Sequence, residues 1–354
     1  MAEAYREDVE LWDEMSYRVR AMKTLILGGS TFVGRRMVDL LVREGHGVSV
    51  LNRGRTSTAL PEGVERIVGD RTSTDSMRDA LGGTEWDTVI DVSGFVMAAG
   101  GGQFEELIAL LDGCVGSYVF VSSIMAYEPS GVMPWTEDAA TTSDPVTTYG
   151  GFKAHAERAI LERHASTGFP GSIARPAAIY GPDNNIHDME TAMFLRLRRG
   201  LPILLPHEGL VTTSYGHVDD LCLNLREMAE LPAVRGEIVN ITGQGASARA
   251  WTHLLAGVVG TEPNIIEVPA GYTDRKPLYG HLFGAKHHGI LSTDKAATLG
   301  LTVERGIEHG YRETYEWFCT TALVDAPDQL SDPMWGAGYD FALEAEVARE
   351  LQGR

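Results

Sequence analysis

The sequence is poor in cysteine and in positive charge, and it contains no long apolar run. Its three cysteines are far apart, and none stands in a CxxC or other metal-binding spacing, which is typical of reduced, buried thiols. Acidic residues outnumber basic ones by 49 to 30, so the formal net charge is −19. This charge argues against binding nucleic acid through its phosphates. No apolar stretch approaches the roughly 18 residues that a membrane span needs. We therefore expect a cytoplasmic protein without nucleic-acid or membrane partners.

Glycine is abundant, at 40 of 354 residues, and implies many tight turns or close backbone approaches. Hydrophobic residues make up 44% and charged residues 22% of the chain, as in an ordinary globular protein with one large domain or two. Residues 1–21 are rich in acidic side chains and lack an apolar segment. We interpret them as an N-terminal extension and not as a signal peptide.

Short apolar runs alternate with helical patterns from residue 23 to about residue 180. Strands are predicted at 24–27, 48–51, 66–68, 88–92 and 117–121, and helices at 33–43, 73–81, 104–111 and 149–165. Continuous apolar strands that alternate with helices indicate a parallel sheet covered on both faces. The fold class is therefore α/β, with a doubly wound parallel sheet.

Beyond this region the elements are shorter, and loops rich in glycine and proline separate them. Strands are predicted at 203–205, 237–241 and 265–268, and helices at 188–199, 218–229, 249–259 and 340–350. We divide the chain into a first domain over 22–180, to which some later segments return, and a smaller α/β lobe over 181–325. Residues 326–354 form a C-terminal tail and helix in this interpretation.

A glycine-rich turn follows the first predicted strand and opens the first helix. Its residues include Gly28, Ser30, Thr31, Phe32, Val33 and Gly34. This context is the one that a dinucleotide-binding turn requires, because amides at the start of a helix can face a pyrophosphate. A threonine stands where a middle glycine is commoner, so the loop has to curve in another way. The alternative is an ordinary glycine-rich turn between a strand and a helix.

The end of the second strand bears on the choice of cofactor. Asn52 replaces the acid that usually binds the ribose hydroxyls of NAD, and Arg53 follows it. An arginine there can bind the 2′-phosphate of NADP, so we favour NADP over NAD. The alternative is that Arg53 and Arg55 belong to a solvated loop. Asp70 and Arg71, after the third strand, are expected beside the adenine.

Tyr149 and Lys153 are predicted to lie one turn apart on the same face of a helix. A phenol is a poor proton shuttle at neutral pH, and a neighbouring ammonium lowers its pKa. Ser123, at the end of the fifth strand, can hydrogen-bond the reacting oxygen. Tyr272 and Lys276 share the spacing, but proline and glycine flank them and argue against a helix.

These motifs together resemble the extended short-chain dehydrogenase/reductase family, the NAD-dependent epimerase/dehydratase group. The resemblance covers about residues 23–318 and rests on the segments 28–34, 69–70, 122–123, 149–153, 175–182, 217–221 and 292–300. It implies a dinucleotide-binding Rossmann domain, followed by a substrate-binding lobe over 181–325. It also implies that Ser123, Tyr149 and Lys153 are the catalytic triad. By the same resemblance, Ser93 and Gly94 lie along the cofactor, and Pro176 lies near the nicotinamide.

Two departures from the family pattern narrow the expected chemistry. Family members that dehydrate or decarboxylate nucleotide sugars carry a threonine at the serine position, followed by an acidic or small residue and then a glutamate. This chain has Ser123, Ile124 and Met125 there, which argues against 4,6-dehydratase chemistry because no acid is available to protonate a leaving hydroxyl. Many sugar-nucleotide epimerases carry arginine a few residues before His217, whereas here the segment is 212–215, Thr-Thr-Ser-Tyr. A UDP-sugar is therefore not favoured.

The resulting prediction is an NAD(P)-dependent epimerase or reductase that moves a hydride at a secondary alcohol or ketone of a sugar-like or sugar-nucleotide-like substrate. One alternative is an NADPH-dependent ketone reductase that acts on a non-sugar metabolite. A second, of a different class, is a cofactor-binding regulatory or RNA-associated protein without turnover. The Tyr149–Lys153 pair and the charge of −19 favour an enzyme.

The resemblance further implies a homodimer formed through the helices at 104–111 and 149–165. Apolar side chains that qualify for this interface are Phe104, Leu107, Leu110, Leu111, Ile160 and Leu161. No metal is expected. The histidines at 281, 287 and 288 have no partnered acid and are typical of a polar loop.

Overall fold

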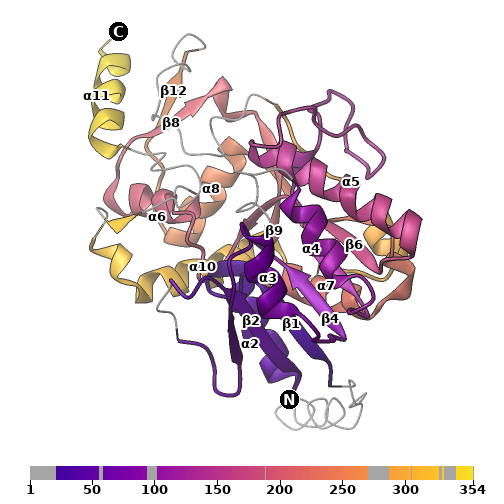
Figure 1. Ribbon diagram of the computed structural model, residues 1–354. Coiled ribbons are helices and arrows are strands. Elements are labelled where there is room, and N and C mark those ends of the chain that lie inside the picture. The colour runs from indigo at the N-terminus through magenta and orange to yellow at the C-terminus, as the bar shows by residue number, and fades with distance from the viewer. Residues whose placement is uncertain are drawn as a thin grey trace, which may run out of the picture.

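The computed structural model describes residues 21–55, 59–93, 102–187, 189–269, 287–303, 305–326, 329–330 and 340–353. A parallel sheet in the order β10-β6-β5-β4-β1-β2-β3 is the centre of the larger lobe (Figure 1). Its strands are β1 (Lys23–Leu27), β2 (Gly47–Asn52), β3 (Glu65–Val68), β4 (Thr88–Asp91), β5 (Tyr118–Val121), β6 (Gly171–Pro176) and β10 (Ile238–Ile241). The predicted doubly wound α/β fold is confirmed. The sheet gains β6, which the sequence did not indicate, and β10, which returns from the later part of the chain.

Helices cover both faces of this sheet. On one face lie α2 (Phe32–Arg43) and α7 (Val218–Glu230), and on the other lie α3 (Thr74–Leu81), α4 (Gln103–Leu111) and α5 (Tyr149–Thr167). Side chains alternate between the faces along each strand. Leu25 and Leu27 therefore pack with α3, α4 and α5, whereas Ile26 packs with α2 and α7.

Two adjacent glycines press the start of α5 against the loops before it. A Cβ on Gly150 would lie 2.2 Å from the carbonyl oxygen of Met125, and one on Gly151 would lie 2.2 Å from that of Pro145. The Thr148 side chain caps the helix by accepting a hydrogen bond from the Gly151 amide. Tyr149, the first helical residue, is therefore held next to the end of β5.

The smaller lobe contains two small sheets, β11-β9-β7 and β12-β8. Its strands are β7 (Ala178–Tyr180), β8 (Ile203–Pro206), β9 (Thr212–His217), β11 (Gly245–Ser247) and β12 (Ile265–Val268), and its helices are α6 (Glu190–Arg199), α8 (Ala248–Val259), α10 (Ile307–Thr320) and α11 (Phe341–Gln352). Shorter segments are η2 (Ile124–Ala126), η3 (His207–Gly209), η4 (Pro232–Val234), α9 (Asp294–Thr298) and η6 (Ala322–Val324). None of the described helices is both long and apolar enough to cross a membrane.

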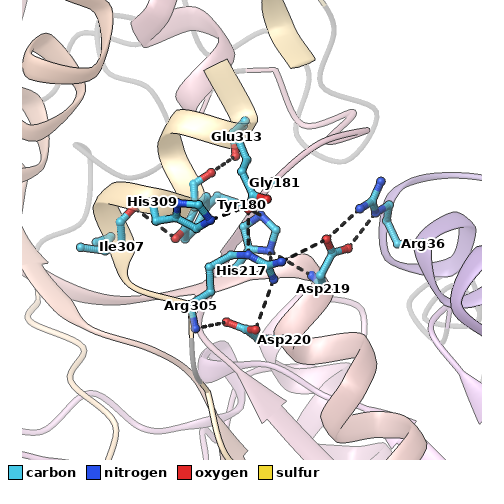
Figure 2. Close-up of polar contacts among 12 residues, drawn as sticks. Arg36, Tyr180, Gly181, His217, Asp219, Asp220, Arg305, Ile307, His309 and Glu313 are labelled. Atoms are coloured by element: carbon cyan, nitrogen blue, oxygen red, sulfur yellow. Dashed lines mark hydrogen bonds and ion pairs between the residues drawn. The ribbon is translucent and has the colours of Figure 1, made fainter. Parts of the chain in front are cut away.

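A polar network joins the two lobes near the N-terminal end of α2 (Figure 2). The Arg36 guanidinium donates to both carboxylate oxygens of Asp219 on α7, at 2.8 and 2.7 Å. Guanidinium nitrogens of Arg305 lie 3.3 Å from the Asp220 carboxylate and 2.7 Å from that of Glu313 on α10. The network therefore links the helix that follows the glycine loop to the smaller lobe.

Candidate active site

The glycine loop closes tightly between β1 and α2. Gly28 has a φ of +102°, and a Cβ on Gly34 would lie 2.2 Å from the Gly28 carbonyl oxygen, so the third glycine allows the close approach of helix to strand. Thr31 is extended, at φ −142°, and Phe32 takes the left-handed conformation at φ +37°. The loop thus curves without positive φ at the threonine.

This loop fits a dinucleotide cofactor. The Thr31 side chain makes no capping hydrogen bond to α2, so the first amides of the helix have no side-chain acceptor there. Amides in this position bind anions such as a pyrophosphate. A Cβ on Gly28 would lie 2.4 Å from the Ser93 Cβ, which places the start of the loop after β4 against the glycine loop. Gly94 lies outside the described residues.

Asn52 supports the glycine loop from the neighbouring strand. Its side-chain amide donates to Ser30 Oγ at 2.9 Å, and its Oδ1 accepts from the Gly54 amide at 2.9 Å. Arg53 is exposed beyond it. Hydrogen bonds from the Thr72 backbone and hydroxyl lower the pKa of Asp70, and Arg53 adds to this effect. Arg53, just after β2, and Asp70, after β3, therefore lie close enough for their charges to interact.

Arg71 occupies a different place from the one expected. Its side chain is buried, with 4% exposed, and it donates to the Asp91 carboxylate at 2.7 and 2.5 Å and to Ser93 Oγ at 2.6 Å. The guanidinium lies beneath the start of the loop that follows β4, whereas the sequence analysis predicted a position beside the adenine. Desolvation explains the difference, because a buried cation needs a paired anion, and Asp91 is that anion.

Ser123, Tyr149 and Lys153 come together at the carboxyl end of β5. Burial raises the pKa of Tyr149, and a hydrogen bond with Ser123 partly offsets this rise. The Lys153 ammonium lies 5.4 Å from the centre of the Tyr149 ring and donates to the Val121 carbonyl at 2.6 Å. Burial lowers the pKa of Lys153 to about 8. The lower Tyr149 pKa expected from the sequence is not found, because burial outweighs the hydrogen bond.

Further buried polar residues adjoin this group and were not predicted. The Glu157 carboxylate accepts from Arg175 at 2.8 and 2.6 Å and from the Ser122 hydroxyl at 2.5 Å. Glu157 follows Lys153 by four residues, so the helical spacing that indicated Tyr149 and Lys153 also contains it. Arg175 lies on β6 immediately before Pro176, which closes that strand.

The other residues that the sequence singled out are the second tyrosine–lysine pair, the histidines and the apolar side chains of the predicted dimer interface. Tyr272, Lys276 and His281 lie outside the described residues. In the part of the chain that the structure describes, no group of three metal-ligating side chains is found. Most of the apolar side chains proposed for a dimer interface are buried within the chain's own core, namely Phe104, Leu107, Leu111 and Ile160.

Comparisons with known proteins bear on the family and the fold of this chain. The model of the NAD dependent epimerase/dehydratase family matches residues 24–242. The chain is 30% identical over 237 residues to the chloroplast stem-loop binding protein of 41 kDa b from Arabidopsis thaliana, a match that covers 63% of this chain and 59% of that protein. It is 28% identical over 257 residues to 2′-dehydrokanamycin reductase from Streptomyces kanamyceticus, covering 70% of each.

The solved structures similar to this chain share its fold. UDP-glucose 4-epimerase from Thermotoga maritima aligns with a TM-score of 0.70 and 21% identity, over 84% of this chain and 98% of that chain. This likeness concerns the fold alone.

Proposed function

This chain belongs to the NAD-dependent epimerase/dehydratase family, and we propose that it is an NAD(P)-dependent epimerase or reductase with Tyr149 as its acid/base. Members of this family are NAD-dependent epimerases, reductases and dehydratases. The observation that carries the proposal is the convergence of Ser123, Tyr149 and Lys153 at the carboxyl end of the sheet, where open α/β sheets bind ligands. The glycine loop lies at the same edge.

In the proposed reaction, each of the three side chains has a separate role. A nicotinamide cofactor, when bound, supplies or accepts a hydride at the substrate carbon. Ser123 Oγ hydrogen-bonds the substrate oxygen and the Tyr149 hydroxyl, which holds the oxygen in line for proton transfer. Tyr149 gives its proton to that oxygen during reduction and takes it back during oxidation. The Lys153 ammonium favours the phenolate, and burial keeps water away from the transfer.

The cofactor proposed is NADP, with NAD as the alternative. Arg53 is exposed at the end of β2 and the acid typical of NAD sites is replaced by Asn52. An exposed guanidinium at this edge suits a 2′-phosphate. Mass spectrometry of the protein as purified, for bound NAD(H) or NADP(H), tests the proposal directly. A protein that carries and binds neither cofactor contradicts it.

The substrate proposed is a sugar or sugar-nucleotide-like molecule, converted without dehydration. Ile124 and Met125 follow Ser123, so no carboxylate is available there to protonate a leaving hydroxyl. Met125 is 39% exposed, and the Ile124 side chain lies against Gly289. These apolar side chains also suit the alternative, an NADPH-dependent ketone reductase of a non-sugar metabolite. The Streptomyces relative is named 2′-dehydrokanamycin reductase, which supports reduction as the reaction. Kanamycin is built from amino sugars, so this name also suits a sugar-like substrate.

A second class of function has one specific observation in its favour. The Arabidopsis relative is named as a stem-loop binding protein, which supports an RNA-associated or regulatory role without turnover. The net charge of −19 opposes phosphate binding. A filter-binding titration with stem-loop RNA, run beside a turnover assay with sugar ketones and NADPH, separates the two. RNA binding without turnover would overturn the enzymatic proposal.

We further propose a cytoplasmic homodimer. Leu110 and Leu161 are partly exposed on α4 and α5, and they are the remaining apolar side chains of the predicted interface. Light scattering at micromolar concentration tests this assembly, and a monomer there contradicts it.

A further inference from the structure

Five charged side chains lie buried between the sheet and α5. They are Arg71, Asp91, Lys153, Glu157 and Arg175, each at most 4% exposed. The strand residues among them share one face of the sheet, because they alternate with residues that pack on the other face. Along this face the charges alternate in sign. We call these five residues the buried charge row.

Asp91 is the anion at one end of the row. Its carboxylate accepts four hydrogen bonds, from Arg71 Nη1 at 2.7 Å, Arg71 Nη2 at 2.5 Å, the Tyr118 hydroxyl at 2.7 Å and the Ser93 amide at 3.1 Å. These donors favour its charged form. Burial works the other way, yet Arg71 holds the pKa of Asp91 below its usual range. Asp91 is therefore a fixed negative charge with no exposed surface.

Glu157 is the second anion, one helical turn beyond Lys153. Arg175 clamps its carboxylate with two hydrogen bonds, and the Ser122 hydroxyl supplies a third. Arg175 in turn stacks on the Tyr127 ring, with its guanidinium carbon 4.3 Å from the ring centre. This clamp fixes the carboxylate beneath α5.

Lys153 lies between these anions. Its ammonium is 4.8 Å from the centre of the Phe120 ring, and Phe120 is the strand partner of Asp91 in the parallel register. It donates a hydrogen bond to the Val121 carbonyl, and among the described residues no carboxylate forms an ion pair with it. Asp91 and Glu157 act on it through space and favour its charged form, whereas Arg71 opposes them.

We propose that Asp91 and Glu157 are positioning residues that keep the Lys153 ammonium charged beneath Tyr149, and that Arg71 limits the effect of Asp91. The inference rests on the proposed function only in the role it gives to Tyr149. The physical reason is desolvation: a lysine in this dry position loses its proton readily unless fixed anions stand near it. The charged groups that act on Lys153 are Asp91 from β4, Arg71 from the loop after β3 and Glu157 from α5, and the Tyr149 ring lies beside the ammonium. Tyr118 from β5 and Arg175 from β6 bind the two carboxylates.

The inference predicts shifts of opposite sign for different residues of the row. Asp91→Asn and Glu157→Gln each remove an anion, so each should lower the pKa of Lys153. Arg71→Gln removes a cation and leaves Asp91 its bonds from Tyr118 and Ser93, so it should raise that pKa. A merely structural role for the row predicts no such reversal of sign.

The experiment is an NMR titration of the full-length protein labelled with [ε-¹³C]lysine. The chain has only five lysines, and the signal missing from Lys153→Met identifies Lys153. We expect a decrease of about one pH unit for Asp91→Asn and Glu157→Gln, and an increase of similar size for Arg71→Gln. The matched control is Glu344→Gln, which breaks an equally buried bidentate pair with Arg196, at 2.8 and 2.6 Å, remote from the row. It should leave Lys153 unchanged.

Unchanged titration of Lys153 in the row variants, or the same shift in Glu344→Gln, would overturn the inference. If Asp91→Asn and Glu157→Gln fail to fold, Arg71→Gln alone tests the inference: a rise in the pKa of Lys153 supports it, and a fall or no change overturns it. The titration needs no substrate, so it succeeds or fails independently of turnover. Suppose that the Lys153 pKa shifts as expected in the row variants but Tyr149→Phe keeps full activity. The proposed function would then be refuted, whereas the inference about the buried charge row would hold.

Discussion

Two ion-pair networks in this protein use the same chemical groups in different surroundings. The buried charge row lies between the sheet and α5, and its members are almost without exposed surface. The network between the lobes, centred on Arg36, Asp219 and Arg305 (Figure 2), keeps about a quarter of each side chain exposed. Water screens the second network and cannot reach the first. The first therefore influences protonation at Lys153, whereas the second mainly ties α2 to the smaller lobe.

Tyr149→Phe should produce the largest effect, because the charge row acts on the reaction through this residue. The variant loses the transferable proton and keeps the packing of the ring, so turnover should fall by about 10²–10⁴-fold with little change in cofactor affinity. Steady-state kinetics with NADPH and a sugar ketone measure this fall.

Tyr272→Phe is the control for this loss, because Tyr272 shares the sequence spacing but not the predicted helix. It should retain turnover close to that of the wild type. The assignment of Tyr149 is wrong if Tyr149→Phe remains active or if Tyr272→Phe is the variant that loses activity.

Glu157→Gln and Asp219→Asn compare the stability of the two networks directly. Glu157→Gln leaves Arg175 buried without its anion and should lower the free energy of unfolding by about 3–5 kcal/mol. Asp219→Asn affects the partly exposed Arg36 and should cost about 1 kcal/mol or less. Urea unfolding measures both. Equal losses would show that burial does not distinguish the two networks.

The pH dependence of stability should also distinguish the buried charge row from the network between the lobes. Lys153 has a pKa of about 8 in the folded protein, below its ordinary value of 10.5, so between these pH values the unfolded chain binds more protons. Stability should therefore rise with pH over this window, by roughly 3 kcal/mol from Lys153 in total. Chemical unfolding at pH 7.5 and pH 10.5, with Lys153→Met as the reference, measures this rise. A constant difference between the two proteins would argue against the lowered pKa.

Arg53→Ala tests a cation that lies at the surface and not in the buried charge row. Arg53 is exposed and, unlike Arg71, is available to a ligand phosphate. Its loss should weaken NADP binding by about 1.5–3 kcal/mol and leave NAD binding almost unchanged. Fluorescence titrations with both cofactors measure the difference. Wild-type protein that binds NADP and NAD equally well would contradict the proposed role.

Much of the larger lobe follows from local sequence patterns. The predicted strands and helices up to residue 167 agree with the structure to within a few residues, because their apolar periods and glycine stops are local signals. β6 was missed. It is short and ends in Arg175 and Pro176, which are typical of a loop, and only the pairing of Arg175 with Glu157 allows an arginine inside the sheet.

The sequence by itself determined the α/β class, the glycine loop after β1 and the placement of Tyr149 and Lys153 one turn apart. Each depends on residues close together in the chain, whose spacing sets their geometry. Only the tertiary structure decided which charges are paired. Arg71 and Asp91 are 20 residues apart, and Glu157 and Arg175 are 18 residues apart. Their contact depends on strand order in the sheet and on the desolvation that makes an unpaired buried charge too costly.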